Sequence, residues 1–287
     1  MKFKNFLNII YQEFIYGGHY IALGVPAIIF TTIILLNQFF SWVLIIIGYL
    51  LTFISYRYNY YKELTRDLLT NPGRTRYIIK SLNFSQILSI IYFFILLIIL
   101  IFFTDAIIIL FSLFFLIIGI LYTNLFKAVT KKILAFKNLY IGISWALIIY
   151  LVAFYYSIFN WAIFFIFLFV FFRLFLNTVF FDIKDIKTDI KDNIKTIPVV
   201  FGKEKSLKFL HILNLLSFVP IVIGVYLGFL AKIALILLVF YLYSCYYLEK
   251  AKNKKSDIQK LSYIITDGEY FLWPIILLFG KAILINF

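Results

Sequence analysis

Charged residues are scarce in this chain of 287 residues: 14% are Asp, Glu, Lys or Arg, whereas 64% are hydrophobic. The mean hydropathy of +1.01 lies outside the range of soluble globular proteins and within that of proteins with several membrane spans. A single cysteine, Cys245, excludes an intrachain disulfide, and its apolar surroundings indicate an inert packing residue. Residues 1–15 lack both an early apolar core and a small-residue cleavage site, so no cleavable signal peptide is expected.

Acidic residues are also few, because 13 Asp and Glu stand against 27 Lys and Arg, and the net charge is +14. The basic residues are scattered among the loops between apolar runs and form no DNA- or RNA-binding motif, which argues against nucleic-acid binding. Positive charge in such loops instead indicates a topology signal and attraction to anionic lipid head groups. We therefore expect membrane lipids, and no nucleic acid, among the partners.

Long apolar runs dominate what is present. They predict an all-α, polytopic membrane protein: a bundle of nine transmembrane helices in one domain over residues 1–287. Residues 1–18 precede the bundle as an amphipathic segment at the membrane surface, and His19 is expected to serve there as a polar anchor. The expected helices cover residues 20–40, 42–58, 86–103, 105–123, 138–156, 160–181, 207–227, 231–248 and 270–286. Very short turns near Asn37 and Asp105 are expected to join the first two of these helices and the next two.

Lys and Arg are distributed asymmetrically between the loops. Nearly all of them lie in residues 56–85, 124–137, 182–206 and 249–269, and the alternate turns carry almost none. The positive-inside rule therefore predicts a multi-pass protein of the cell membrane, with the N-terminus and these four loops in the cytoplasm and the C-terminus outside. In the last of these loops we expect Asp267 to be exposed and ordinary.

Residues 182–202 contain the first group of candidate functional residues. Four aspartates, at spacings of three, four and three residues, fall on one face of a helix: Asp182, Asp185, Asp189 and Asp192. Like charges on one face repel each other, and a divalent cation relieves that repulsion. Hard oxygen ligands indicate Mg²⁺. The alternative is a solvated helix end, because lysines are interleaved at Lys184, Lys187 and Lys191.

A second acidic cluster lies in residues 59–76. Asn59, Glu63 and Asp67 follow an apolar run at spacings of four residues, which again places them on one helical face. Two such faces, each at the end of an apolar helix, could hold two metal ions with a phosphate group between them.

The two clusters resemble the Asp-rich motifs of the UbiA superfamily of intramembrane prenyltransferases. The second family motif is roughly D-x-x-D-x-x-x-D-x-x-x-G-x-x-T-x-P-V-x-x-G. The chain matches it at Asp182, Asp185, Asp189, Thr196, Pro198, Val199 and Gly202. Asn193 replaces the family Gly, which is a mild change because Asn tolerates the left-handed conformation.

The first family motif is roughly N-D-x-x-D-x-x-x-D, followed by Pro and Arg. The chain matches it at Asn59, Asp67, Pro72 and Arg74, whereas Tyr60 and Glu63 replace two aspartates. Tyr60 lies about 100° around the helix from the acidic face and is not expected to be a ligand. A third likeness covers residues 122–138, where Tyr122, a lysine-containing stretch and Lys137-Asn138 follow the order found in the family.

The resemblance implies an Mg²⁺-dependent prenyltransferase. Such an enzyme moves an isoprenyl group from a polyprenyl diphosphate donor to a lipophilic acceptor and releases diphosphate. The acceptors of the family include quinone precursors, other rings and glycerol-phosphate lipids. The fold it implies also has nine transmembrane helices, with cytoplasmic loops that cap the active site.

The resemblance also assigns roles to residues. The catalytic residues would be Asp182, Asp185 and Asp189. Two Mg²⁺ ions would be bound by these three aspartates together with Asn59, Glu63 and Asp67. The diphosphate would be bound by Arg74, Lys131, Lys132 and Lys137.

Two other functions stay open at the level of the sequence. A polytopic transporter is one, because intramembrane acidic residues can line a transport path. A catalytically degenerate family member that binds lipid is the other, and it is suggested by Tyr60 and Glu63. Release of diphosphate from a prenyl diphosphate would distinguish the enzyme from both.

Overall fold

The computed structural model describes residues 10–124, 126–253 and 256–285, and every regular element in these ranges is a helix. The chain divides into two compact units. Unit 1 contains Met1–Pro26 and Ser41–Leu125, and unit 2 contains Ala27–Phe40 and Phe126–Phe287. Residues 1–9 of the expected amphipathic segment lie outside the described residues, and Ile10–Tyr16 are helical.

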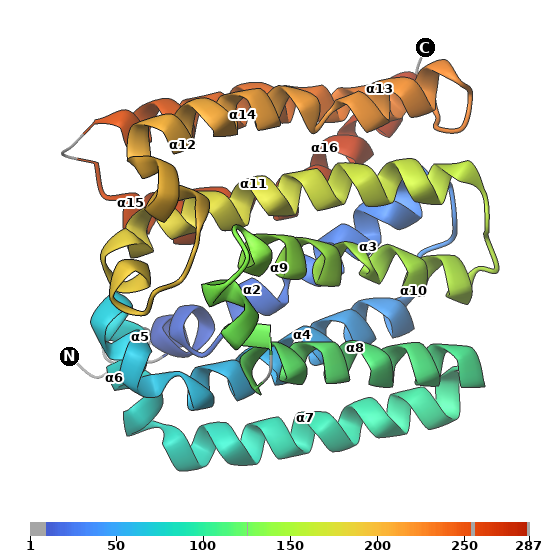
Figure 1. The fold of residues 1–287 in the computed structure, drawn as a ribbon. Coiled ribbons are helices and arrows are strands. Elements are labelled where there is room, and N and C mark those ends of the chain that lie inside the picture. The colour runs from blue at the N-terminus through green and yellow to red at the C-terminus, as the bar shows by residue number, and fades with distance from the viewer. Residues whose placement is uncertain (1–9, 125, 254–255, 286–287) are drawn as a thin grey trace, which may run out of the picture. The chain divides into compact units, whose positions relative to one another are not determined.

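The helices of unit 1 surround α4, which packs against α2, α7 and α8. Contact with α8 is close because Gly119 has no side chain: a Cβ there would lie 2.6 Å from the Ser55 hydroxyl oxygen. The elements, shown in Figure 1, are α2 (His19–Ala22), the start of α3 (Gly24–Leu35), α4 (Trp42–Lys62), α5 (Leu64–Thr70), α6 (Pro72–Lys80), α7 (Leu82–Phe103) and α8 (Ala106–Asn124).

Unit 2 is built on α11 (Trp161–Lys191), the longest helix of the described chain. It packs against α9, α12 and α13, and α12 packs against α14 (Figure 1). The remaining elements are the rest of α3, η1 (Phe126–Lys131), α9 (Phe136–Ala146), α10 (Ile148–Tyr155), α12 (Ile197–Leu216), α13 (Val219–Tyr226), η2 (Lys232–Leu238), α14 (Val239–Lys252), α15 (Ile258–Lys260), the π-helical η3 (Leu261–Thr266) and α16 (Asp267–Ile285).

The prediction of an all-helical, polytopic membrane protein is confirmed, but the count of nine spans is not. Among the described residues, seven helical stretches are long and apolar enough to cross a membrane, or eight if a bent pair is one span. The bent pair is Ile10–Tyr16 with His19–Leu35, which meet at 54°. Ala106–Tyr122 is apolar but shorter than the others, and this is why the ninth expected span is not counted.

Several helix ends follow from local chemistry. Ser41 caps α4 and Asn160 caps α11, each by accepting a hydrogen bond from a backbone N–H in the first turn. The expected tight turns are also found, because Asn37 has a left-handed φ of 53° and Asp105 accepts from the N–H of Ile108 at 3.3 Å. The main boundary error concerns α11, which continues to Lys191 instead of ending near residue 181.

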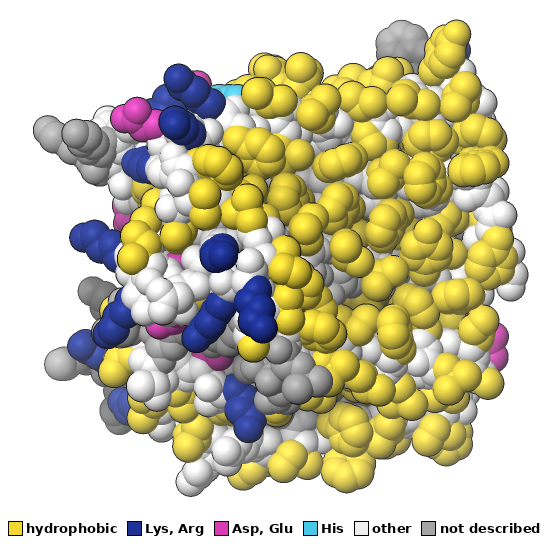
Figure 2. Space-filling model, in the orientation of Figure 1, with side chains coloured by type: hydrophobic (Ala, Val, Ile, Leu, Met, Phe, Trp, Pro, Cys, Tyr) yellow, Lys and Arg dark blue, Asp and Glu magenta, His cyan; other side chains and the backbone are white. Residues whose placement is uncertain are grey.

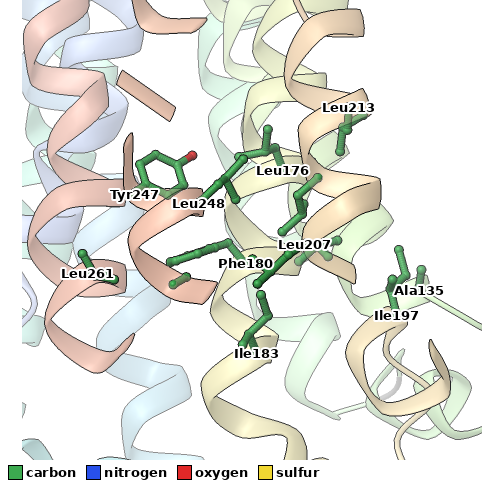
Figure 3. Packing of buried hydrophobic residues seen from close by; sticks show 13 residues of the cluster. Ala135, Leu176, Phe180, Ile183, Ile197, Leu207, Leu213, Tyr247, Leu248 and Leu261 are labelled. Carbon is green, nitrogen blue, oxygen red and sulfur yellow. The ribbon is translucent and has the colours of Figure 1, made fainter. Parts of the chain in front are cut away.

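Apolar packing fixes the C-terminal half of α11. Leu176, Phe180 and Ile183 point into a buried cluster with side chains of α12 and α14 (Figure 3). In the view of Figure 2, hydrophobic side chains cover most of the surface of the helices, whereas Lys and Arg gather at the end of the helices where α11 ends and α12 begins. This separation is that of a helix bundle in lipid with one polar end.

Candidate functional site

The three aspartates of the second motif lie on one unbroken helix, α11. Asp182 and Asp189 are fully buried. Lys137 donates to one carboxylate oxygen of Asp182 at 2.5 Å, and Asn138 donates to the other at 2.7 Å. Both donors come from the first turn of α9, so the packing of α9 on α11 brings the Lys137 ammonium to the acidic face.

Asp185 has a different partner. The Lys184 ammonium lies 2.8 Å from each of its two carboxylate oxygens. Lys184 is one of the interleaved lysines, and its side chain is only 9% exposed. Lys187 and Lys191 do have exposed side chains, so the interpretation of a solvated helix end fits those two lysines and not Lys184.

The end of α11 explains two further motif positions. Asn193 adopts a left-handed φ of 56°, and the N–H groups of Asn193 and Ile194 bond to the carbonyls of Ile190 and Asp189. This is the double hydrogen-bond pattern of a Schellman motif, in which Asn can replace Gly. Gly202 has φ 78° and ψ 165°, a conformation that is almost restricted to glycine, and it bends α12 one turn after Pro198.

The segment before α9 is held against the segment after α11. The N–H of Lys195 donates to the Thr130 carbonyl at 3.0 Å, and the N–H of Ala135 donates to the Lys195 carbonyl at 2.9 Å. Lys131 and Lys132 therefore lie next to the end of the second motif, with exposed side chains. Of the three predicted diphosphate-binding lysines, Lys137 alone has a hydrogen bond to a motif aspartate among the described contacts.

The first motif lies in unit 1, across a break in the helix. α4 ends at Lys62 and α5 begins at Leu64, with Glu63 between them in a non-helical conformation. The backbone bonds nevertheless continue, because the N–H of Glu63 donates to the Asn59 carbonyl at 3.0 Å and that of Asp67 to the Glu63 carbonyl at 2.8 Å. The predicted column of Asn59, Glu63 and Asp67 is thus kept through the break.

Arg74 joins this column to Tyr60. Its guanidinium donates to Asp67 at 2.5 Å and lies 4.2 Å from the centre of the Tyr60 ring. Tyr60 is buried, and its aromatic face supports Arg74 through a cation–π contact. The residue that replaces a family aspartate therefore contacts the predicted diphosphate-binding arginine.

The chemistry of these donors fits a hard divalent cation. Among residues 10–124, 126–253 and 256–285, no group of three or more His, Cys, Asp or Glu side chains is gathered as a metal cluster. Mg²⁺, however, typically takes one or two carboxylates and completes its shell with water and phosphate oxygens. Asp182 and Asp185 each accept a hydrogen bond from a lysine ammonium, with N–O distances of 2.5 and 2.8 Å. Their oxygens are therefore directed at positive charge.

The sequence reasoning missed a polar centre in unit 1 around Glu13. Its carboxylate accepts hydrogen bonds from Arg57 at 2.5 Å and from the Tyr77 hydroxyl, and His19 lies at 3.1 Å. Burial raises the pKa of Tyr77 to about 12, and the bond to the Glu13 carboxylate adds to the shift. Glu13 thus ties the N-terminal helix to α4 and α6, and His19 lies in this network.

A second missed centre lies in unit 2 around Arg173, which is fully buried on α11. Its guanidinium donates to both carboxylate oxygens of Glu269, at 3.0 and 2.5 Å, and to Asn214 at 2.7 Å. The hydroxyls of Ser217 and Ser244 accept its other bonds at 3.2 and 2.5 Å. Every N–H of this buried cation is therefore satisfied, as low-dielectric surroundings require.

The expectation that Asp267 is exposed was wrong. It is 7% exposed, and Asn177 of α11 donates to it at 3.2 Å. The expected loop over residues 249–269 is shorter than predicted, because helical structure resumes at Ile258 and brings Asp267 into the packed part of the bundle.

Comparison with known proteins gives a family. A model of the UbiA prenyltransferase family matches residues 42–275. A search of curated proteins finds no match.

Solved structures give the same fold. A UbiA homolog from Aeropyrum pernix K1, in its apo form, has a TM-score of 0.69 and 16% identity over 92% of this chain and 97% of that chain. A UbiA homolog from Archaeoglobus fulgidus bound to DMAPP and Mg²⁺ has a TM-score of 0.66 and 15% identity, over 94% and 98%. A digeranylgeranylglyceryl phosphate synthase has a TM-score of 0.55 and 16% identity, over 92% and 96%.

At these identities the solved structures establish the fold alone, and the family model carries the assignment. A transporter is not supported, because the match covers well over half of the chain, both acidic motifs included. The chain belongs to the UbiA prenyltransferase family and is a membrane-embedded transferase of prenyl groups.

Proposed function

We propose that the chain moves an isoprenyl group from a polyprenyl diphosphate to a lipophilic acceptor, in a reaction that requires Mg²⁺ and releases diphosphate. The observation that carries the proposal is the buried carboxylate of Asp182, held between Lys137 and Asn138 on the acidic face of α11. Two structures of a UbiA homolog from Archaeoglobus fulgidus contain Mg²⁺ and a prenyl diphosphate, DMAPP in one and GPP in the other, which supports this class of donor.

The proposed ligands are those of the two motifs. Asp182, Asp185 and Asp189 in unit 2, and Asn59, Glu63 and Asp67 in unit 1, would hold two Mg²⁺ ions, and both units would act as one catalytic domain. When bound, Mg²⁺ would neutralise charge on the diphosphate as it departs.

The basic side chains have a separate task. Arg74 and Lys137 would donate to diphosphate oxygens, because each already lies beside a motif carboxylate at 2.5 Å. Lys131 and Lys132 would contribute from the loop that is bonded to Lys195. Their positive charge would favour the leaving group more as its negative charge develops, and that difference lowers the barrier.

The bond changes are those of an alkyl transfer. The bond between the allylic carbon and the diphosphate oxygen breaks, and its electron pair leaves with the oxygen. An electron-rich atom of the acceptor then bonds to that carbon, and the acceptor loses a proton. Aromatic faces can stabilise the cationic carbon by about 0.5–2 kcal/mol each. Apolar helices exclude water, which would otherwise hydrolyse the donor.

A reconstitution assay tests this proposal. Purified protein in lipid vesicles should release radiolabelled diphosphate from geranylgeranyl diphosphate when Mg²⁺ and a membrane lipid extract are present, and should not when EDTA replaces Mg²⁺. Donor binding without release would indicate a catalytically degenerate protein. Mass spectrometry of lipids from cells with and without the protein would then identify the acceptor, whether a quinone precursor, another ring or a glycerol-phosphate lipid.

We also propose nine spans, with the N-terminus and the basic loops in the cytoplasm. The support is the separation of Lys and Arg from apolar surface on unit 2 (Figure 2). In a Cys245→Ser background, single cysteines at Ser157 and Lys252 should react with a membrane-impermeant thiol reagent from opposite sides. Reaction of both from the same side would overturn the topology.

A further inference from the structure

The contact between Lys184 and Asp185 is unusual for a helix. Neighbouring residues point about 100° apart on a helix surface and do not normally face each other. Here the ammonium nevertheless lies 2.8 Å from both carboxylate oxygens. The two side chains are 9% and 16% exposed, so water screens the pair far less than it screens a surface ion pair.

Two aromatic rings hold the ammonium in this position. Its nitrogen lies 5.6 Å from the centre of the Phe181 ring and 5.3 Å from the centre of the Tyr263 ring. Phe181 precedes Lys184 by one turn of α11, whereas Tyr263 comes from the π-helical element η3, which packs against α11. The rings themselves meet edge to face, 5.6 Å apart. Tertiary packing therefore directs Lys184 onto Asp185.

We infer that Lys184 is an internal counter-ion that competes with the divalent metal for Asp185 and thereby sets the metal affinity of the enzyme before the donor binds. This inference rests on the proposed function, since it takes Asp185 as a metal ligand. An ammonium that lies 2.8 Å from both carboxylate oxygens repels a Mg²⁺ ion that approaches the same carboxylate, so metal binding favours displacement of Lys184.

The competition has a measurable size. When a site is available for only a fraction of the time, the apparent Kd equals the intrinsic Kd divided by that fraction. A lysine that occupies Asp185 for about nine-tenths of the time therefore weakens metal binding about tenfold. After displacement, the ammonium keeps its aromatic contacts, and its charge is available to an incoming diphosphate.

The test measures metal binding without any donor. The full-length protein in lipid nanodiscs is titrated with Mn²⁺, an oxygen-seeking substitute for Mg²⁺, and free Mn²⁺ is followed by electron paramagnetic resonance. Lys184→Met removes the competing charge and should tighten Mn²⁺ binding about tenfold, and Lys184→Gln should do the same. Lys184→Arg keeps the charge and should stay within about threefold of the wild type.

Lys187→Met is the matched control, because Lys187 is exposed on the same helix and its loss changes the net charge equally. It should alter the Kd by less than about twofold, since exposed charges are screened. Equal or weaker Mn²⁺ binding in both Lys184→Met and Lys184→Gln would overturn the inference. If Asp185→Asn leaves Mn²⁺ binding unchanged, Asp185 is not a ligand and the proposed ligand set fails as well.

Discussion

The two acidic motifs obtain their basic partners in different ways. In unit 2, Asp182 is held by Lys137, which lies 45 residues earlier in the chain and on another helix. In unit 1, Asp67 is held by Arg74, only seven residues later. The second motif therefore depends on how α9 packs against α11, whereas the first is assembled largely from one local stretch of chain.

This difference also concerns the backbone. α11 runs unbroken through its three aspartates and ends in two defined hydrogen bonds after Asp189. α4 stops at Lys62, and Glu63 lies in a break, although the bonds between successive turns continue. A rigid helix fixes the spacing of its ligands, whereas a break allows a residue of another length to be accommodated. We therefore expect the second motif to tolerate change less than the first.

The largest expected effect is on Asp182. Asp182→Asn keeps the shape of the side chain but removes the charge opposite Lys137, so kcat should fall by about 10³-fold, or about 4 kcal/mol in barrier. Asp192→Asn, one turn beyond the three motif aspartates, is the control and should stay within about tenfold. Rates of diphosphate release, with thermal melting as a check on folding, would measure both. A wild-type rate for Asp182→Asn would show that this carboxylate is not part of the machinery.

A smaller loss is expected at Glu63. Glu63→Gln removes one charged ligand from the broken helix, and we expect about a 10²-fold loss of kcat, or about 2.7 kcal/mol in barrier, with a higher Mg²⁺ requirement. The Mg²⁺ dependence of the initial rate would measure it. If Glu63→Gln cost more than Asp182→Asn, the first motif would be the less tolerant of the two, and the comparison would have to be reversed.

A substitution at Gly202, at the end of the second motif, should have a smaller effect, and that effect should be on the free energy of unfolding. Gly202→Ala places a Cβ in open space, but at φ 78° and ψ 165°, so the cost of about 1–3 kcal/mol comes from backbone strain alone. Asn193→Gly is the control, since φ 56° suits Gly at least as well. Unfolding in increasing SDS would report both free energies. Equal stabilities for Gly202→Ala and the wild type would show that the bend in α12 can relax.

The smallest effect is predicted for Tyr60. Tyr60→Phe keeps the aromatic face 4.2 Å from the Arg74 guanidinium and removes only the hydroxyl. Activity and Mg²⁺ requirement should both stay within about threefold, or about 0.7 kcal/mol. A strong rise in the Mg²⁺ requirement would instead make Tyr60 a ligand, and the first motif would then have been rebuilt around a tyrosine.

Local patterns in the sequence were enough to predict the helical class, the tight turns at Asn37 and Asp105, and the left-handed tolerance at Asn193. Each depends on a residue and its close neighbours, such as apolar runs or φ > 0 at Asn. The break at Glu63 could not be predicted this way, because neither Gly nor Pro marks it. Residue spacing nevertheless placed Asn59, Glu63 and Asp67 in one column, since the backbone bonds persist.

Contacts between residues that are distant in the chain could not be predicted from the sequence. Nothing near Lys184 indicates that Tyr263, 79 positions away by number, directs it onto Asp185. For the same reason Asp267 was wrongly expected at the surface, although Asn177 holds it in the packed bundle. One polar signal was present: charged residues inside apolar runs, such as Arg173, are rare and require partners.

Arg173 has a consequence for the synthesis and membrane insertion of the protein, because its ion-pair partner is made later. Its acidic partner, Glu269, is 96 residues later, so at about 5–20 residues per second it is synthesised about 5–20 s after Arg173. An unpaired arginine at the centre of a helix costs about 2.5–3.5 kcal/mol during insertion, which the apolar residues of α11 must offset. Asn214 follows after 41 residues and can accept the first hydrogen bond. Biogenesis of unit 2 therefore includes an interval in which the charge of Arg173 on α11 is not yet paired with Glu269 of α16.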